Sequence, residues 1–303
     1  MSIRKKERIR FKDRLYKGID VDGHFKISGI KTTEVVRSAQ QRHHLSLLTT
    51  VLLGRTLTAA MLLASELKGD ERIRVILEGS GPVGSVVAEA NRRGEIRGYV
   101  SNPQAELDYS DEATTLGDGL GVGVLTVTKT LYNEAEPRHS TIELFKGDVT
   151  ADIAHYLTQS EQIPSAVLLD TGMDDRGKVT HAGGILVQRL PDAPEEVIET
   201  LQDRLRRFNP VSELLEQGQY IDEIMQNAVD PYRMRVIDKV PIHFFCRCSR
   251  DRFLSALSML SHEELRELDG ESQEVVCHFC NNKETISADE IHEITSAAQA
   301  KMN

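Results

Sequence analysis

All four cysteines of this 303-residue chain lie in its last 58 residues, where they form two close pairs. The first pair is Cys246-Arg-Cys248, and the second, Cys277-His-Phe-Cys280, follows after 28 intervening residues. A tetrahedral zinc site needs four ligands, and two short turns that each present two thiolates supply them. Four unrelated buried thiols would not cluster in this way in a chain that otherwise lacks cysteine. We therefore predict one zinc ion per chain, held by Cys246, Cys248, Cys277 and Cys280.

The Cys-x-Cys spacing of the first pair also indicates redox chemistry. Residues two apart in an extended chain have α-carbons about 6.6 Å apart, at the outer limit for a disulfide. A Cys246–Cys248 bridge would therefore be strained, and strained disulfides belong to the labile, regulatory class. His243 and His278 adjoin the cysteines, but four thiolates need no further ligand. The pattern favours a switch in which zinc keeps the thiols reduced and the tail folded, and oxidation removes both conditions.

In residues 1–190, runs of expected strands are interrupted by separate helices. This pattern predicts an α+β domain in which helices pack on antiparallel sheet. A hairpin is expected from strands at 16–21 and 25–30, turned at Asp22-Gly23. Further strands are expected at 73–77, 83–90, 96–100, 121–131, 141–145, 165–171 and 184–190. Helices are expected at 33–41, 45–67 and 148–160. The helix at 45–67 is Leu-rich, but the central Arg55 would cost roughly 3 kcal/mol in a membrane, so a buried core helix is the better interpretation.

A helical linker is predicted over residues 191–232, followed by a zinc-binding domain at 233–303. The first linker helix, at 195–208, carries an apolar stripe on an otherwise charged surface. The stripe consists of Val197, Ile198, Leu201, Leu205 and Phe208. Shorter helices are expected at 212–217, with Ser212 as the N-cap, and at 220–229. A helix with such a stripe is stable only when the stripe is docked against another apolar surface.

The sequence contains no recognisable catalytic constellation, so we do not expect an enzyme. Residues 79–84 are glycine-rich, but no Lys-Ser or Lys-Thr follows them, so they do not form a phosphate loop. The glycines from Gly117 to Gly123 lead into a strand rather than a helix, which is the wrong order for a dinucleotide site. Turn glycines and close packing within a sheet are the expected explanation.

Charge and hydropathy argue against two classes of partner. The formal net charge is −10, and residues 241–303 carry 6 basic and 11 acidic side chains, so nucleic acid is not expected as a partner. Residues 1–55 carry 13 basic and 5 acidic residues, which indicates a solvated first element or an interaction arm. No continuous apolar run follows the basic start, so we expect neither a signal peptide nor a membrane partner. We expect a cytoplasmic protein.

Several motifs together resemble the redox-regulated 33 kDa heat-shock chaperones, the heat-shock protein 33 family. In the tail these motifs are FFCRCSRDR at 244–252 and VCHFCN at 276–281. Upstream they are LGRTLTAA at 53–60, GSGPVG at 79–84 and AGGILVQ at 182–188. The likeness spans about residues 12–295. Two features depart from it: Glu284-Thr285-Ile286 stands where members often have an aromatic-x-aromatic pair, and the charged first dozen residues resemble an extension.

The resemblance implies an ATP-independent holdase that binds unfolding proteins under oxidative and heat stress and is inactive while reduced and zinc-bound. It implies that oxidation pairs Cys246 with Cys248 and Cys277 with Cys280, releases zinc, unfolds the linker and leads to a homodimer. An undocked linker would expose an apolar patch suited to client proteins. The candidate client-binding residues are therefore those of the stripe: Val197, Ile198, Leu201, Leu205 and Phe208.

Three other interpretations remain open at this point. A zinc-ribbon module could bind nucleic acid, although the acidic tail argues against it. A thiol–disulfide oxidoreductase could use Cys277 and Cys280, although such enzymes place Cys-x-x-Cys at a helix start and lack a second pair. The zinc site could also be purely structural.

Overall fold

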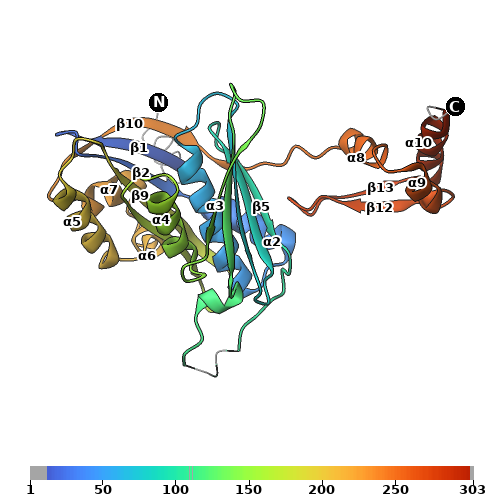
Figure 1. The fold of residues 1–303 in the computed structure, drawn as a ribbon. Helices are drawn as coiled ribbons and strands as arrows, with labels where there is room; N and C mark the ends of the chain where they lie inside the picture. The colour runs from blue at the N-terminus through green and yellow to red at the C-terminus, as the bar shows by residue number, and fades with distance from the viewer. Residues whose placement is uncertain (1–11, 109, 111, 301–303) are drawn as a thin grey trace, which may run out of the picture. The chain divides into compact units, whose positions relative to one another are not determined.

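The computed structural model describes residues 12–108, 110 and 112–300, so most of the basic start, residues 1–11, lies outside the described residues. The chain forms two compact units that divide between Phe245 and Cys246. The first unit is a mixture of sheets and helices, as Figure 1 shows. The predicted α+β class is confirmed.

Two sheets form the first unit. The five-stranded sheet is antiparallel, with the order β10-β1-β2-β9-β8. Its strands are β1 (Arg14–Asp20), β2 (Phe25–Lys31), β8 (Ser165–Met173), β9 (Val179–Arg189) and β10 (Met234–Pro241). The six-stranded sheet has the order β11-β5-β4-β3-β6-β7. Its strands are β3 (Arg72–Gly79), β4 (Ser85–Asn91), β5 (Glu95–Val100), β6 (Gly123–Thr130), β7 (Arg138–Glu143) and β11 (His243–Phe244).

Helix α3 (Leu47–Ala64) packs against strands of both sheets and forms the centre of the main hydrophobic core (Figure 1). It is apolar and long enough to cross a membrane by composition alone, with a mean hydropathy of 1.7, but 78% of it is buried within the protein. The prediction of a core helix is therefore confirmed. Its Arg55 pairs at 2.7 Å with Asp148, the N-cap of α4 (Val149–Gln159), so the one central charge of α3 has a partner.

The two glycine-rich segments pack against each other. The N–H of Gly81 donates to the carbonyl of Leu120 at 2.7 Å, and Val83 donates to Gly119 at 3.0 Å. A Cβ on Gly79 would lie 2.1 Å from the Leu120 carbonyl oxygen, so a side chain cannot fit there. The short 3-10 helix η1 (Leu116–Gly119) leads into this contact. Close packing is thus the reason for these glycines.

The predicted linker is helical and docked. Helices α5 (Glu195–Arg206), α6 (Val211–Glu216) and α7 (Ile221–Ala228) pack on the face of the five-stranded sheet that α3 does not occupy. All members of the predicted stripe face this second core: Val197, Ile198, Leu201 and Leu205 are buried, and Phe208 is partly buried. The sheet contributes Phe25, Ile27, Ile185 and Val187 to the same cluster.

The predicted N-cap at Ser212 is wrong. Helix α6 begins at Val211, directly after Pro210, and Ser212 lies inside its first turn. The N–H of Ser212 donates to a carboxylate oxygen of Asp170 on β8 at 3.0 Å. The helix start is therefore satisfied by a side chain 42 residues away, which local sequence could not reveal.

Residues 233–245 belong structurally to the first unit, although the sequence assigned them to the zinc domain. Strand β10 pairs along the whole length of β1, with Leu15 opposite Val240. Strand β11 then pairs in parallel with β5 of the other sheet, and the N–H of Phe245 donates to Ile96 at 2.9 Å. Residues 233–245 are part of the first unit because their backbone hydrogen bonds are made with its strands β1 and β5.

The second unit is small. It contains α8 (Arg250–Leu257), α9 (His262–Leu268), the hairpin of β12 (Gln273–Val276) and β13 (Lys283–Ile286), and α10 (Ala288–Ala300). Its buried apolar side chains include Leu265, Ile286 and Ile291. Ile286 therefore occupies a core position in the segment where family members often carry an aromatic residue.

Gly29 on β2 leaves the space that Met225 of α7 fills, since a Cβ on Gly29 would lie 2.3 Å from Met225 Cγ. We predict that Gly29→Ala lowers the free energy of unfolding by about 1–3 kcal/mol, because the packed core must shift. In a Met225→Ala background the same change should cost much less, since the obstructing side chain is gone. Urea unfolding of the four proteins measures both effects. Equal costs in the two backgrounds would contradict this contact.

Asp13 connects three elements. It is 5% exposed, its carboxylate accepts from the N–H of Val35 at 2.9 Å near the start of α2 (Thr33–His43), and its carbonyl accepts from Ile242 at 3.3 Å. Burial raises the pKa of Asp13 to about 7, against the lowering effect of the Val35 N–H.

Because the folded state holds the Asp13 proton up to about pH 7 while the unfolded chain releases it near pH 4, stability should fall as pH rises through that window. The slope contributed by one proton is about 1.4 kcal/mol per pH unit. Asp13→Asn keeps an acceptor for Val35 and should flatten this part of the profile. Urea unfolding between pH 4 and 8 is the measurement, and an identical profile for both proteins would contradict the assignment.

Candidate metal centre

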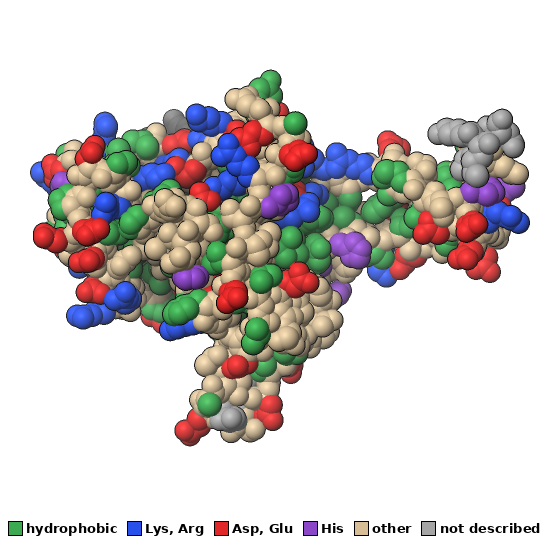
Figure 2. Space-filling view, viewed as in Figure 1, with side chains coloured by type: hydrophobic (Ala, Val, Ile, Leu, Met, Phe, Trp, Pro, Cys, Tyr) green, Lys and Arg blue, Asp and Glu red, His purple; other side chains and the backbone are tan. Residues whose placement is uncertain are grey.

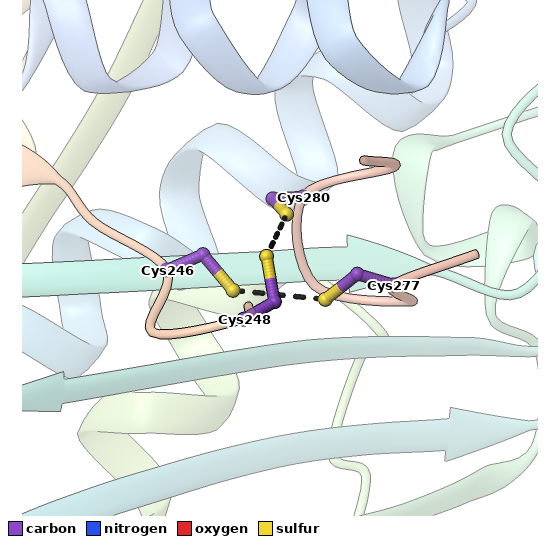
Figure 3. A group of neighbouring side chains, drawn as sticks. All are labelled: Cys246, Cys248, Cys277 and Cys280. Carbon is purple, nitrogen blue, oxygen red and sulfur yellow. Dashed lines mark hydrogen bonds between the residues drawn. The ribbon is translucent and has the colours of Figure 1, made fainter. Parts of the chain in front are cut away.

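Two loops of the second unit present the four cysteines, as Figure 3 shows. Cys246 and Cys248 lie on the extended segment before α8, and Cys277 and Cys280 lie in the turn between β12 and β13. The carbonyl of Cys277 accepts from the N–H groups of Cys280 at 3.3 Å and Asn281 at 2.7 Å. Asn281 has φ 55°, a left-handed conformation that Asn tolerates better than most residues. This tight turn directs both thiols of the second pair to one side.

The four sulfur atoms lie within 4.8 Å of one another. The distance from Cys246 Sγ to Cys277 Sγ is 3.6 Å, and that from Cys248 Sγ to Cys280 Sγ is 3.3 Å. All four cysteines are free thiols rather than disulfides. One tetrahedral zinc with Zn–S bonds of about 2.3 Å would place its sulfur ligands about 3.8 Å apart. The cluster could therefore hold one metal ion, and its all-sulfur donor set is compatible with zinc.

The environment of the thiols disfavours charge unless a cation is bound. Burial raises the pKa of the Cys280 thiol, and the neighbouring thiols raise it further. Burial likewise raises the pKa of Cys248. A coordinated cation reverses this preference, because a metal-bound thiol is deprotonated outright. Four thiolates packed this closely would therefore be much more stable around a bound dication than without one.

Arg250 links the first cysteine loop to the rest of the second unit through ion pairs and a hydrogen bond. Its guanidinium pairs with Glu290 of α10 at 2.5 Å and with Glu284 of β13 at 3.5 Å, and it donates to the carbonyl of Thr285 at 3.0 Å. These bonds connect the start of α8, two residues beyond Cys248, to the hairpin that carries Cys277 and Cys280. Sequence reasoning did not identify this role, because a charged residue in a tail does not reveal its partners.

The structure places the other predicted site residues in the first unit, where the stripe of α5 is buried in the second hydrophobic core. Their role in client binding stays a prediction. Sequence reasoning also passed over Asp20, Asp22 and His24, whose potential ligand atoms lie within 4.8 Å of one another at the β1–β2 turn. The Asp20 carboxylate accepts from the backbone N–H of His24 at 3.1 Å and lies 3.0 Å from its ring nitrogen, so it stabilises this turn.

Comparison with known proteins identifies the family of this chain and agrees with its fold. The family model described as Hsp33 protein matches residues 13–287 of this chain. The chain belongs to the Hsp33 family. The resemblance stated from the tail and core motifs is therefore confirmed.

Relatives of this Hsp33 chain are named 33 kDa chaperonin. The protein from Carboxydothermus hydrogenoformans is 40% identical over 284 residues, covering 93% of this chain and 97% of the relative. The Bacillus subtilis protein is 34% identical over 284 residues, covering 92% and 97%. A crystal structure of the Hsp33 homologue from Thermotoga maritima superposes with a TM-score of 0.87 at 31% identity, covering 95% of this chain and 99% of that one.

We predict that the reduced protein binds one equivalent of zinc and that Cys277→Ser or Cys280→Ser lowers the content below half an equivalent. A tetrahedral thiolate site that loses a ligand loses much of a binding free energy of about 10–16 kcal/mol. His278→Ala is the matched control, because it alters the same turn and keeps all four thiols. Metal analysis after gel filtration is the measurement. Loss of zinc in His278→Ala, or less than half an equivalent in the parent protein, would contradict a four-cysteine site.

Proposed function

We propose that this protein is a redox-regulated, ATP-independent holdase that binds unfolding proteins and prevents their aggregation under oxidative and heat stress. The observation that carries this proposal is the cluster of four free thiols, built from Cys-x-Cys and Cys-x-x-Cys in a chain of the Hsp33 family. The relatives' name, 33 kDa chaperonin, supports the chaperone part. A site made of thiolates suits a reducing compartment, so we place the protein in the cytoplasm.

In the reduced state a bound zinc ion would hold the four thiolates deprotonated and join the two cysteine loops. Hydrogen peroxide takes two electrons from two thiolates, which form one disulfide, and the peroxide takes up two protons from solvent and leaves as two molecules of water. Applied to Cys277 with Cys280 and to Cys246 with Cys248, this reaction consumes all four ligands. A second unit with so few buried apolar side chains, among them Leu265, Ile286 and Ile291, would then lose much of its stability.

The linker is the element that we propose oxidation releases. Helices α5 to α7 bury one apolar side against the five-stranded sheet and expose charged side chains elsewhere. The chain that follows them, β10 and β11, leads directly to Cys246. Undocking would expose a continuous apolar surface on both the helices and the sheet, which is the kind of surface that binds unfolded chains. Two such activated protomers would associate as a homodimer.

The alternative functions have less support. The Cys277–Cys280 motif lies between two strands rather than at a helix start, which is unlike a thiol–disulfide oxidoreductase. Lys and Arg side chains are interspersed with Asp and Glu over the visible face of the described residues (Figure 2). A nucleic-acid module would instead concentrate its basic residues.

Aggregation of a thermally unfolding client enzyme tests the proposed function. We predict that the peroxide-oxidised protein suppresses light scattering at about equimolar ratio and that the reduced, zinc-loaded protein does not. Cys246→Ser with Cys248→Ser should weaken zinc binding and leave partial activity even under reducing conditions, because the second unit is already loosened. His278→Ala should behave like the parent. Equal suppression by the oxidised and reduced parent protein would refute redox control, and no suppression by either would refute the holdase.

The two pairs should oxidise in order. The turn at Cys277–Cys280 brings its two thiols to the same side, whereas a Cys246–Cys248 bridge needs a kink in an extended segment. We predict that the Cys277–Cys280 disulfide forms first, followed by loss of zinc and then by the Cys246–Cys248 disulfide. Mass mapping of alkylated peptides during a slow peroxide titration follows both. Accumulation of the Cys246–Cys248 disulfide first would show the strain argument to be wrong.

A further inference from the structure

Strand β8 forms one edge of the five-stranded sheet, and its free side faces a groove in the first unit. The groove has a volume of about 590 Å³. Its floor includes Ser165 to Leu168 of β8, and its walls come from α4 on one side and from α5 with Phe208 on the other. Figure 1 shows both helices beside this sheet. The edge is thus recessed between two helices.

The phase of the β8–β9 ladder shows which backbone groups of β8 face the groove. The N–H of Arg189 donates to the carbonyl of Pro164 at 3.0 Å, so Pro164 points toward β9. Backbone groups alternate in direction along an antiparallel strand, so Ser165, Val167 and Leu169 point the opposite way. The side chain of Gln202 on α5 confirms this phase, because its amide donates to the carbonyl of Ser165 at 2.8 Å.

The Gln202 amide therefore supplies the hydrogen bond to the Ser165 carbonyl that a neighbouring strand would otherwise supply. Within the described part of the chain, the outward N–H and C=O groups of Val167, which lines the groove, make no hydrogen bond. Leu169 also points outward but is 2% exposed and lies beyond the groove. Unpaired groups at the edge of a sheet pair readily with an extended polypeptide.

The walls of the groove determine which polypeptide fits. Apolar side chains line it, among them Phe145, Ala154 and Leu205. Lys146, His155 and Arg206 supply its charged or chargeable groups, and none of the described lining residues is acidic. The groove therefore complements an extended segment with apolar and acidic side chains.

A second copy of this chain fits the groove less well. Pairing two β8 edges about a twofold axis would bring the basic groups of both grooves together. Helix α4, which is not part of the released linker, would also meet its counterpart before two recessed edges could approach. A single unfolded chain meets neither obstacle.

We propose that the free edge of β8 binds, by strand addition, an extended segment of an unfolding client that carries both apolar and acidic side chains. This inference rests on the proposed holdase function and names how that function holds its client. Backbone pairing reads no sequence, which suits a protein that must accept many clients. While α5 is docked, Gln202 occupies the position at Ser165 and shortens the available edge. Release of α5 frees that position and removes the α5 wall of the groove, while Phe145, Lys146 and His155 on the α4 side remain to contact the client.

A labelled nonapeptide of alternating valine and threonine with glutamate at both ends is the probe, and fluorescence anisotropy with the oxidised protein is the readout. The comparison peptide carries N-methyl groups on its four central residues, which removes backbone donors and keeps every side chain. We expect the N-methylated peptide to bind at least about tenfold more weakly, since each lost backbone hydrogen bond costs roughly two- to tenfold in affinity. Equal binding of the two peptides would overturn strand addition.

Val167→Pro tests the site on the protein. Its N–H points outward, so proline removes a donor to the groove and leaves the ladder with β9 intact, a placement that edge strands tolerate. We expect peptide affinity to fall about fivefold or more in Val167→Pro and to stay within about twofold in the control Val167→Ala. If Val167→Pro does not fold, as judged by its thermal transition, the peptide comparison on the parent protein decides alone.

The outcomes separate this inference from the proposed function. If Val167→Pro binds the probe as well as the parent and still suppresses client aggregation, the holdase stands and the β8 site is wrong. If Val167→Pro changes only the sedimentation of the oxidised protein, the edge joins two copies of the chain, and client binding there is likewise overturned. If the parent protein suppresses no aggregation, the proposed function itself fails.

Discussion

The docking of α5, α6 and α7 on the five-stranded sheet is the contact on which the rest of the account depends. These helices have one strongly apolar side each, and that side is buried against β2, β8 and β9. Isolated helices of 6 to 12 residues are too short to be stable in water, so their helical state depends on this burial. Close fits such as Met225 over Gly29 make the contact specific. Any event that weakens the docking therefore removes the helices as well as the contact.

The second unit is stabilised differently. Its 58 residues form a small core, and below about 70–80 residues a hydrophobic core alone seldom supplies enough stability. The proposed zinc ion would compensate for this, because a single ion bound by all four sulfur atoms would contribute a large share of the folding free energy. Arg250 adds a second connection between the same loops through Glu290 and Glu284. With zinc bound, much of the stability of this unit would therefore depend on thiolates that an oxidant can attack.

The sequence allowed prediction of the features that depend on residue spacing. It did not allow prediction of the contacts between residues far apart in the chain. Cys246, Cys248, Cys277 and Cys280 were identifiable because ligand pairs on short turns have a recognisable spacing. The stripe of α5 was identifiable from its helical period, and the core helix from its length and composition. Strand β10 was missed because the adjacent residues Val236 and Ile237 are both apolar and both exposed, at 36% and 56%, so this edge strand shows no clean alternation of apolar and polar residues. The bond from Ser212 to Asp170 was missed because no local pattern specifies a partner 42 residues away. The open edge of β8 became visible only once the order of strands was known.

Hydrogen exchange of the full chain before and after complete peroxide oxidation tests the central claim most directly, namely that the state of the four thiols controls the docking of α5 to α7. The account predicts that amides of these three helices exchange at least about tenfold faster after oxidation, because docking is all that protects them. Amides of β6, which is paired on both sides with β3 and β7 in the other sheet, should keep their protection and serve as the internal reference. Unchanged protection of α5 to α7 in a protein that has formed both disulfides and lost its zinc would contradict the account.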